Sequence, residues 1–369
     1  MQKKLNIGVL FGGRSGEHEV SLVSATSIIA ALDKNKYDIV PIGITPSGKW
    51  FSSDDILDVL KSKKAPYPEN EVAILPEPSR KGLFHVKDGR LTPLDTVFIV
   101  LHGTYGEDGT VQGLLDLAGI AYVGAGTMGS SVGMDKIVQK DIVRQAGINT
   151  ASSLWFLTRD VAASADDVIK EIEKKLPYPC FVKPANSGSS VGISKAHNRG
   201  ELKASLTDAS RYDRRILIEK GIVDAREIEI SVLGNDDPVA SCPGEVVSSN
   251  EFYDYDAKYV DGRSKTVVPA DIHPKTAEEI KQIAIKAFKA LDLSGMARID
   301  FLVTKDAIFF NEANTIPGFT SISMYPKLFE ASGIKYPDLL DRLIGLAIER
   351  GTERSKFLTS YQPKSEWYK

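Results

Sequence analysis

A short hairpin in the C-terminal third restricts the fold of this chain more than any other feature. Residues 297–303 and 308–314 are both rich in apolar strand-forming residues, and a polar stretch at 304–307 separates them. Two apolar runs on either side of a polar turn are typical of a β-hairpin. The sequence therefore predicts an antiparallel strand pair at this point.

Polar side chains of this hairpin are expected to share one face. Side chains two residues apart point the same way along a strand, so if Asp300 lies opposite Glu312, then Arg298 lies opposite Asn314. Two carboxylates directly across a strand pair destabilise a sheet unless positive charge lies between them. Mg²⁺ is one candidate, because it takes a few oxygen ligands together with substrate phosphates. A solvated polar face in another register explains these residues equally well, so the hairpin alone leaves both open.

Composition excludes several classes of protein. The 369 residues allow two or three domains, and a net charge of −3 gives no electrostatic reason for nucleic acid as the main partner. Cys180 and Cys242 lie far apart without the spacing of metal ligands or of a disulfide framework. No apolar run approaches the roughly 20 residues that span a bilayer. The first strand begins too early for a signal peptide, so we expect a soluble, cytoplasmic protein without a membrane partner.

The N-terminal third alternates strands and helices. Apolar strands are predicted at 5–11, 37–44 and 96–101, with a helix that begins near Ser21. This alternation indicates βαβ units and a parallel sheet. Residues 52–93 are weaker in pattern and are expected to hold insertions at the edge of the sheet.

The rest of the chain mixes helices with paired strands. Helices are predicted at 134–145, 163–176, 202–209, 276–291 and 336–350, and strands at 178–183, 192–194 and 215–219, with a strand-rich stretch from 228 to 247. A polar segment with three tyrosines follows at 248–269. Long segments without regular structure are commonly functional lids or disordered, and we favour a lid.

A glycine- and serine-rich loop at 183–192 follows a predicted strand. Its successive N–H groups could cradle phosphate oxygens, and Lys183 would add charge. Lys136 opens a helix and could reach the same phosphates. The pattern is not a Walker A loop. A flexible hairpin turn and an ordinary solvated lysine are the simpler alternatives.

Three further residues have a possible role in binding a nucleotide. Glu219 and Lys220 end a strand at a turn, where acceptors commonly meet an adenine amino group, and Glu227 could bind ribose hydroxyls. Surface charge is the alternative for each.

The glycines at 124–129 match GxGxxG, but the nearest acidic residue, Asp141, falls inside a helix rather than after a second strand. They are better explained as a turn that links domains.

Two loops of the N-terminal third follow strands, at 12–21 and 102–109. Parallel α/β sheets bind ligands at the carboxyl ends of their strands, so both loops should face one crevice. Glu17 could pair there with a substrate ammonium group. His102 is either a general base or a hydrogen-bond anchor.

Eight short motifs occur in order along the chain: GGxSxEHEVS, LHGxxGEDG, MDK, VKPxxxGSSVG, IEK, FYDYxAKY, ARID and NExNTxPGFTxxS. Together they resemble the motifs of the D-alanine–D-alanine ligases of the ATP-grasp superfamily. The resemblance covers nearly the whole chain, and the stretch at 52–93 does not map onto a motif.

The resemblance implies an α/β fold with an α+β ATP-binding part. Residues 1–124 would form a Rossmann-like substrate domain with a parallel sheet. Residues 125–221 would form the central ATP-grasp subdomain, and residues 222–369 the C-terminal one, with the lid at 248–269 and the metal site. ATP would be gripped between two antiparallel sheets.

The resemblance also implies roles for residues that match the family's motifs. ATP would be bound through its phosphates, adenine and ribose by Lys136, Lys183, Lys258, Glu219, Lys220 and Glu227. Two Mg²⁺ ions, with Mn²⁺ as an alternative, would be held by Asp300, Glu312 and Asn314. The first D-alanine would meet Glu17, Ser189 and Tyr259. The oxyanion would meet Arg298 and the N–H of Gly318, and the second D-alanine would meet Ser323, with Met324 and His102 nearby.

The activity implied is the ATP-dependent joining of two D-alanine molecules through D-alanyl phosphate, with release of ADP and phosphate, for peptidoglycan precursor synthesis. The resemblance also suggests a homodimer. Tyrosine at 259 favours D-alanine as the second substrate, and some use of D-lactate or D-serine stays open. The general base stays open among Tyr259 with Ser189, His102 and the leaving phosphate.

Overall fold

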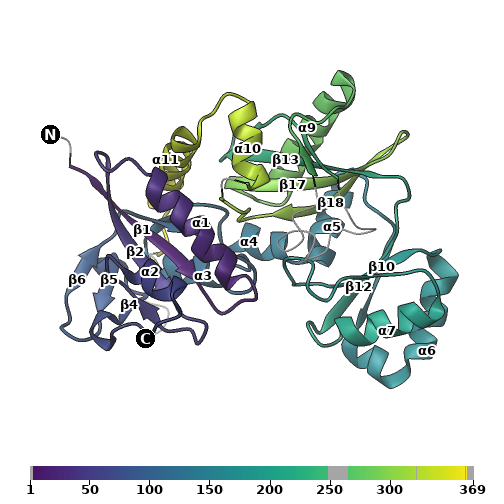
Figure 1. Ribbon diagram of the computed structural model, residues 1–369, viewed down its shortest axis with the longest axis horizontal. Helices are drawn as coiled ribbons and strands as arrows, with labels where there is room; N and C mark the ends of the chain where they lie inside the picture. The colour runs from purple at the N-terminus through teal and green to yellow at the C-terminus, as the bar shows by residue number, and fades with distance from the viewer. Residues whose placement is uncertain (1–2, 248–264, 321, 362, 364–369) are drawn as a thin grey trace.

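The computed structural model of the chain describes residues 3–247, 265–320, 322–361 and 363. Within these residues the chain builds three larger sheets, each with its own helices (Figure 1). The N-terminal part lies at the left of the view, the strands β10 and β12 with their helices at the lower right, and the strands β13, β17 and β18 above them.

The first sheet is largely parallel, as predicted. Its order is β3-β2-β1-β7-β8, and β1 pairs in parallel with both β2 and β7. Its strands are β1 (Leu5–Gly12), β2 (Tyr37–Ile44), β3 (Trp50–Phe51), β7 (Thr96–Ile99) and β8 (Ala121–Tyr122). Its helices are α1 (His18–Ala31), α2 (Ile56–Lys61) and α3 (Thr110–Ala118). The predicted insertion forms a small separate sheet of β4 (Val72–Ile74), β5 (Gly82–His85) and β6 (Leu91–Pro93), with short 3-10 helices at Pro68–Asn70 and Pro78–Arg80.

The second sheet is antiparallel, in the order β11-β10-β12-β9. Two linking helices precede it, α4 (Thr127–Met134) and α5 (Lys136–Gln145). Its elements are β9 (Ser153–Leu157), α6 (Thr158–Lys175), β10 (Cys180–Pro184), β11 (Ser194–Ala196), α7 (Arg199–Ala209) and β12 (Arg215–Lys220). Apolar residues such as Val182, Ile216 and Ile218 pack against α6 and α7 in a core of their own. Because side chains alternate along a strand, Lys183 and Glu219 point to the opposite face.

The third sheet is also antiparallel, in the order β16-β15-β13-β17-β18, with β14 on β13. Its strands are β13 (Arg226–Gly234), β14 (Val239–Ala240), β15 (Gly244–Val247), β16 (Lys265–Val267), β17 (Gly295–Val303) and β18 (Ile308–Asn314). Its helices are α9 (Pro274–Ala290) and α10 (Met324–Ala331). Strands β17 and β18 are the predicted hairpin. Their register is confirmed, because Asp300 pairs with Glu312 and Arg298 with Asn314.

The last helix, α11 (Tyr336–Arg354), lies beside the first sheet and also contacts β13 and β17 of the third (Figure 1). Its Leu339, Leu343 and Ile344 are buried in the same apolar core as residues of β1 and β7. The N-terminal core therefore includes residues from the end of the chain. The division into domains at 124 and 221 stays a prediction.

The glycines at 124–129 serve close backbone packing. Gly124 has a φ of 98°, in the left-handed region that favours glycine. A Cβ on Gly295 would lie 3.1 Å from the Gly124 nitrogen, and one on Gly129 would lie 2.2 Å from the Asp292 carbonyl oxygen. These contacts agree with the predicted role as a linking turn. In the part of the chain described above, no helix is long and apolar enough to cross a membrane.

Candidate active site

Asp300 of the hairpin β17–β18 is paired with an arginine of the same hairpin. Arg298 donates to both oxygens of Asp300, at 2.7 Å each, and its Nε lies 3.1 Å from a carboxylate oxygen of Glu229. Asn314 donates through its amide nitrogen to Asp300 at 2.9 Å. Burial alone would lower the pKa of Arg298, but Asp300 and Glu229 raise it well above its usual value. This cluster is therefore charged and ordered by its own residues.

The same face offers oxygen ligands of the kind that Mg²⁺ prefers. Asp300 and Glu312 lie opposite each other, and Asn314 adds an amide oxygen. Among the described residues, no group of three or more His, Cys, Asp or Glu side chains is arranged to hold a metal. A set of two carboxylates and one amide fits an ion that completes its shell with water and substrate phosphates. Glu229 was not predicted from the sequence, although its alternation with Glu227 along β13 marks it as facing the same way.

Two predicted lysines lie between the second and third sheets. Lys136, at the start of α5, donates to the Ser187 carbonyl oxygen at 2.7 Å and lies 3.7 Å from Glu312. Lys183 forms a 2.5 Å ion pair with Glu219 and lies 3.4 Å from the side-chain oxygen of Asn311. Both side chains are almost fully buried. The lysines thus bring the glycine- and serine-rich loop and β12 against the metal-site hairpin.

A third lysine in this region was missed by the sequence analysis. Lys140 lies one helical turn after Lys136 on α5, with 2% of its side chain exposed. Its Nζ forms a 2.7 Å ion pair with Glu219 and donates to the Asn311 carbonyl oxygen at 2.6 Å. Burial alone would raise the pKa of Glu219, but Lys140 and Lys183 lower it to about 2. The four-residue spacing of Lys136 and Lys140 puts both on one helix face. This spacing was the signal by which Lys140 could have been identified from the sequence.

Glu17 lies where three loops meet. It accepts a hydrogen bond from the hydroxyl of Ser189, which is 172 residues away in the sequence. A Cβ on Gly103 would lie 2.5 Å from a Glu17 carboxylate oxygen, and one on Gly188 would lie 2.6 Å from it. Two loops therefore approach this carboxylate so closely that a larger residue at either glycine would displace the end of the Glu17 side chain. Ser189 has a φ of 46°, an uncommon backbone conformation of the kind found at functional sites.

The loops at 12–21 and 102–109 meet at the carboxyl ends of β1 and β7, as predicted. A cavity of about 220 Å³ there is lined by residues of both loops, including Ser15 and His102. His102 is buried, and protein groups engage both of its ring nitrogens: Nδ1 lies 3.1 Å from the Ile316 carbonyl oxygen and Nε2 lies 3.2 Å from the Ser24 hydroxyl. Its position is therefore that of a hydrogen-bond anchor.

Glu107 belongs to the same loop but was given no role from the sequence. Its carboxylate accepts from the Gly103 N–H at 2.9 Å. Burial and, second, the charge of Glu17 raise its pKa to about 8. A carboxyl group of this kind is a common feature of functional sites.

The remaining predicted residues are spread around this centre. Gly318 adjoins Ser323, since a Cβ on Gly318 would lie 2.8 Å from the Ser323 hydroxyl oxygen, and that oxygen accepts from the Thr320 N–H at 3.0 Å. Met324 begins α10 and is buried in an apolar cluster. Glu227 is partly exposed on β13; burial lowers the pKa of Lys183, while Glu219, Glu312 and, least, Glu227 raise it.

Lys220 is exposed at the end of β12. Lys258, Tyr259 and the first part of the predicted lid lie outside the described residues.

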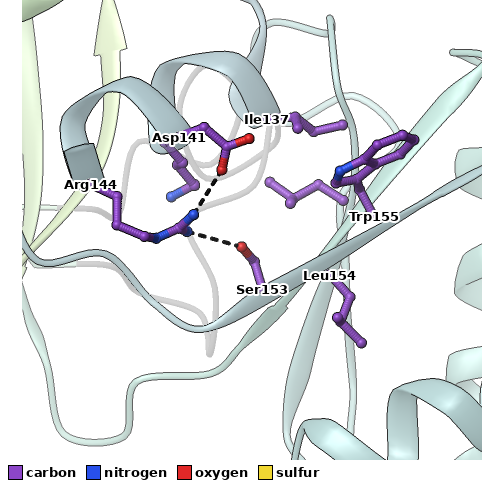
Figure 2. A pocket seen from close by; sticks show the side chains of 8 residues that line it. Ile137, Asp141, Arg144, Ser153, Leu154 and Trp155 are labelled. Carbon is purple, nitrogen blue, oxygen red and sulfur yellow. Dashed lines mark hydrogen bonds and ion pairs between the residues drawn. The ribbon is translucent and has the colours of Figure 1, made fainter.

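A further cavity lies between α5 and the strands β9 and β12. It has a volume of about 280 Å³ and is lined by Ile137, Lys140, Asp141, Arg144, Ser153, Leu154, Trp155 and Leu217. Figure 2 shows that Arg144 is held by Asp141 and Ser153, at 2.7 and 3.4 Å. Of the site residues discussed above, only Lys140 borders this cavity.

Comparison with known proteins agrees with this geometry. Residues 6–125 match the family described as D-ala D-ala ligase N-terminus, and residues 142–345 match D-ala D-ala ligase C-terminus. The chain is 52% identical to a D-alanine–D-alanine ligase of Chloroherpeton thalassium and 48% identical to one of Acetivibrio thermocellus. Each alignment covers 96% of this chain and 99% of the relative.

Solved structures give the same assignment. The D-Ala:D-Ser ligase of Enterococcus faecalis has a TM-score of 0.84 and 39% identity, covering 94% of this chain and all of that one. The D-alanine–D-alanine ligase of Coxiella burnetii has a TM-score of 0.82 and 38% identity, covering 96% and 98%. The resemblance noted in the motifs, the α/β fold and the class of enzyme are thereby confirmed. The chain belongs to the D-alanine–D-alanine ligase family, whose members are ATP-grasp ligases.

Proposed function

We propose that this enzyme joins two D-alanine molecules, with ATP as the driving substrate, to supply D-alanyl-D-alanine for peptidoglycan precursors. One observation carries the assignment to this site. The loop at 183–192 contacts Glu17 through Ser189 and Lys136 through the Ser187 carbonyl oxygen, so a carboxylate for an ammonium group and a cation for phosphates meet residues only two positions apart in one loop. A reaction that phosphorylates an amino acid needs both.

The chemistry has two steps. A carboxylate does not react with an amine, so the γ-phosphoryl group of ATP is first transferred to the carboxylate of one D-alanine, giving D-alanyl phosphate and ADP. The amine of the second D-alanine, after losing a proton, attacks the carbonyl carbon, and phosphate leaves. Lys136 and Lys183 would bind the phosphates, together with Lys258, while Glu219, Lys220 and Glu227 would bind the adenosine part.

Glu17 would orient the first D-alanine through its ammonium group, with Ser189 and Tyr259 alongside. Arg298 and the N–H of Gly318 would stabilise the negative oxygen of the tetrahedral intermediate, since donors fixed in advance stabilise charge that develops in the transition state. Ser323 would bind the carboxylate of the second D-alanine, beside Met324. His102 would support this part of the site from the N-terminal sheet.

Divalent metal use follows from the family, and we propose Mg²⁺, with Mn²⁺ as an alternative, at Asp300, Glu312 and Asn314. Bound there, two such ions would neutralise charge on the phosphates. Arg298 donates to both oxygens of Asp300, so an ion would bind through the lone pairs that these contacts leave or would replace one of them. Glu229 lies in position to keep Arg298.

A coupled ADP-release assay with ATP, Mg²⁺ and D-alanine tests the proposal. We expect ADP release with D-alanine alone and none with L-alanine. D-serine as the second substrate is the alternative, favoured by the likeness to a structure titled D-Ala:D-Ser ligase. Release that depends on added D-serine or D-lactate would replace the dipeptide assignment.

Three further properties complete the proposal. We infer a homodimer, three domains divided near residues 124 and 221, and a cytoplasmic location, where ATP is supplied. Sedimentation at several protein concentrations tests the dimer.

A further inference from the structure

The loop that carries Gly318 leaves the third sheet but is anchored in the core of the first. Phe319 is 1% exposed, and its ring meets Phe98 of β7 edge to face, with centroids 5.8 Å apart. Ile316 is buried in the same core. The residues on both sides of Gly318 are therefore held by the N-terminal part of the molecule.

Hydrogen bonds from two N-terminal segments hold the backbone of this loop. A carbonyl oxygen only accepts, so the Ile316 oxygen, 3.1 Å away, requires the proton of His102 on Nδ1. Burial lowers the pKa of His102, which keeps the ring neutral and leaves Nε2 as an acceptor for the Ser24 hydroxyl at 3.2 Å. The Ser24 oxygen in turn accepts from the Phe319 N–H at 3.5 Å.

Glu107 completes the arrangement on the N–H side of Ile316. Its carboxyl group accepts from the N–H of Gly103 at 2.9 Å, directly after His102 in the chain, and burial and Glu17 raise its pKa more than the nearby Ile316 N–H lowers it. The carbonyl group of Ile316 is thus held by His102, and its N–H lies near the carboxyl group of Glu107. Gly318 lies between Ile316 and the Phe319 N–H held by Ser24.

We propose that Glu107 and Ser24 are positioning residues that aim the N–H of Gly318 at the oxyanion, acting through the peptides of Ile316 and Phe319. The inference rests on the proposed function, in which this N–H stabilises the tetrahedral intermediate. It assigns the N-terminal part a second role besides holding the first D-alanine through Glu17. The donor is then correctly placed only while the first and third sheets stay in contact.

The expected kinetic effect lies in kcat. A misplacement of about 1 Å can cost roughly 100-fold in rate, so Glu107→Ala should lower kcat by about 10- to 100-fold. Its KM for ATP should change by no more than about twofold, because an oxyanion donor acts in the transition state only. Glu107→Gln should recover much of the activity, since its amide oxygen still accepts one N–H. Ser24→Ala, which removes one weaker contact, should show the same kcat effect at a smaller size.

The control is Glu353→Gln, an exposed carboxylate near the end of α11, which should behave as wild type. The inference is overturned if Glu107→Ala keeps its kcat, if the alanine and glutamine variants lose it equally, or if the KM for ATP rises in proportion. Should Glu107→Ala fail to fold, Ser24→Ala gives the same readout.

A second measurement separates this inference from the proposed function. Amide hydrogen exchange at residues 316–319 should be faster in Glu107→Ala and Ser24→Ala than in Glu353→Gln, whatever the activity. If the wild-type enzyme releases no ADP with D-alanine, the proposed function fails, while this exchange still decides whether the two residues hold the loop. Unchanged exchange would refute the positioning role.

Discussion

Replacing Lys140 by methionine removes one cation from the buried contact between α5, β12 and β18. Methionine keeps most of the apolar stem, so the loss comes mainly from the charge. Glu219 keeps its 2.5 Å partner Lys183, but the 2.7 Å pair with Lys140 and the 2.6 Å hydrogen bond to the Asn311 carbonyl oxygen disappear. Removing one partner of a buried pair costs about 3–5 kcal/mol. Lys183 offsets part of this and the abandoned carbonyl group adds about 1–3 kcal/mol, so we expect Lys140→Met to lower the free energy of unfolding by about 3–5 kcal/mol.

Urea unfolding followed by circular dichroism at pH 7 measures this difference. The matched control is Lys203→Met on α7, whose 3.3 Å pair with Asp166 is exposed on both sides. Such surface pairs contribute about 0–1 kcal/mol. A loss for Lys140→Met below about 1 kcal/mol, or equal to that of the control, would refute the reasoning that this cation stabilises the buried carboxylate. Combining it with Glu219→Gln should cost less than the sum of the two single changes.

Three further predictions concern pH, metal and substrate. The pKa of Glu219 is lowered from 4.5 to about 2, so its stabilising contribution is complete above about pH 4.5 and is lost as the pH falls toward 2; Glu219→Gln should flatten this acid limb in thermal unfolding, and an unchanged limb would contradict it. Glu312→Gln should weaken Mn²⁺ binding, measured by electron paramagnetic resonance, and abolish ADP release without unfolding, whereas unaltered Mn²⁺ affinity would place the metal elsewhere. Glu17→Gln should raise the KM for D-alanine by about 10- to 100-fold, as expected for the loss of a hydrogen bond to a charged group worth about 1.5–3 kcal/mol, and leave the KM for ATP unchanged; an equal rise in both would count against its role.

Much of the local structure could be predicted from the sequence, because strand and helix periodicities are properties of neighbouring residues. The strand at 37–44 was predicted with the bounds that β2 has, and the register that places Asp300 opposite Glu312 was one of two left open for the hairpin. That pairing depends on a register shift between Asp300 and Phe301, since regular pairing from the turn would place Asp300 opposite Asn311. The motifs identified the family because each motif is local.

The sequence predicted a cation between Asp300 and Glu312, whereas the structure places one protein cation, Arg298, on Asp300 and another, Lys136, on Glu312. Arg298 lies on the same strand as Asp300, and its guanidinium reaches both Asp300 and Glu229. Whether a long side chain folds back onto its neighbour or extends away depends on burial by the surrounding sheet, which a linear pattern does not contain. The predicted metal site therefore also contains the guanidinium of Arg298, a contact that the periodicity of the strands could not reveal.

The sequence by itself determined the longer helices and strands, the presence of the hairpin and the family. Only the tertiary structure decided which distant residues meet: Lys140 with Glu219, Glu17 with Ser189, and Ser24, His102 and Glu107 around the loop of Gly318. Each of these contacts joins segments that lie far apart in the chain. They form because packing the three sheets and α11 together excludes water from polar groups, which must then find partners among whatever residues the fold brings close.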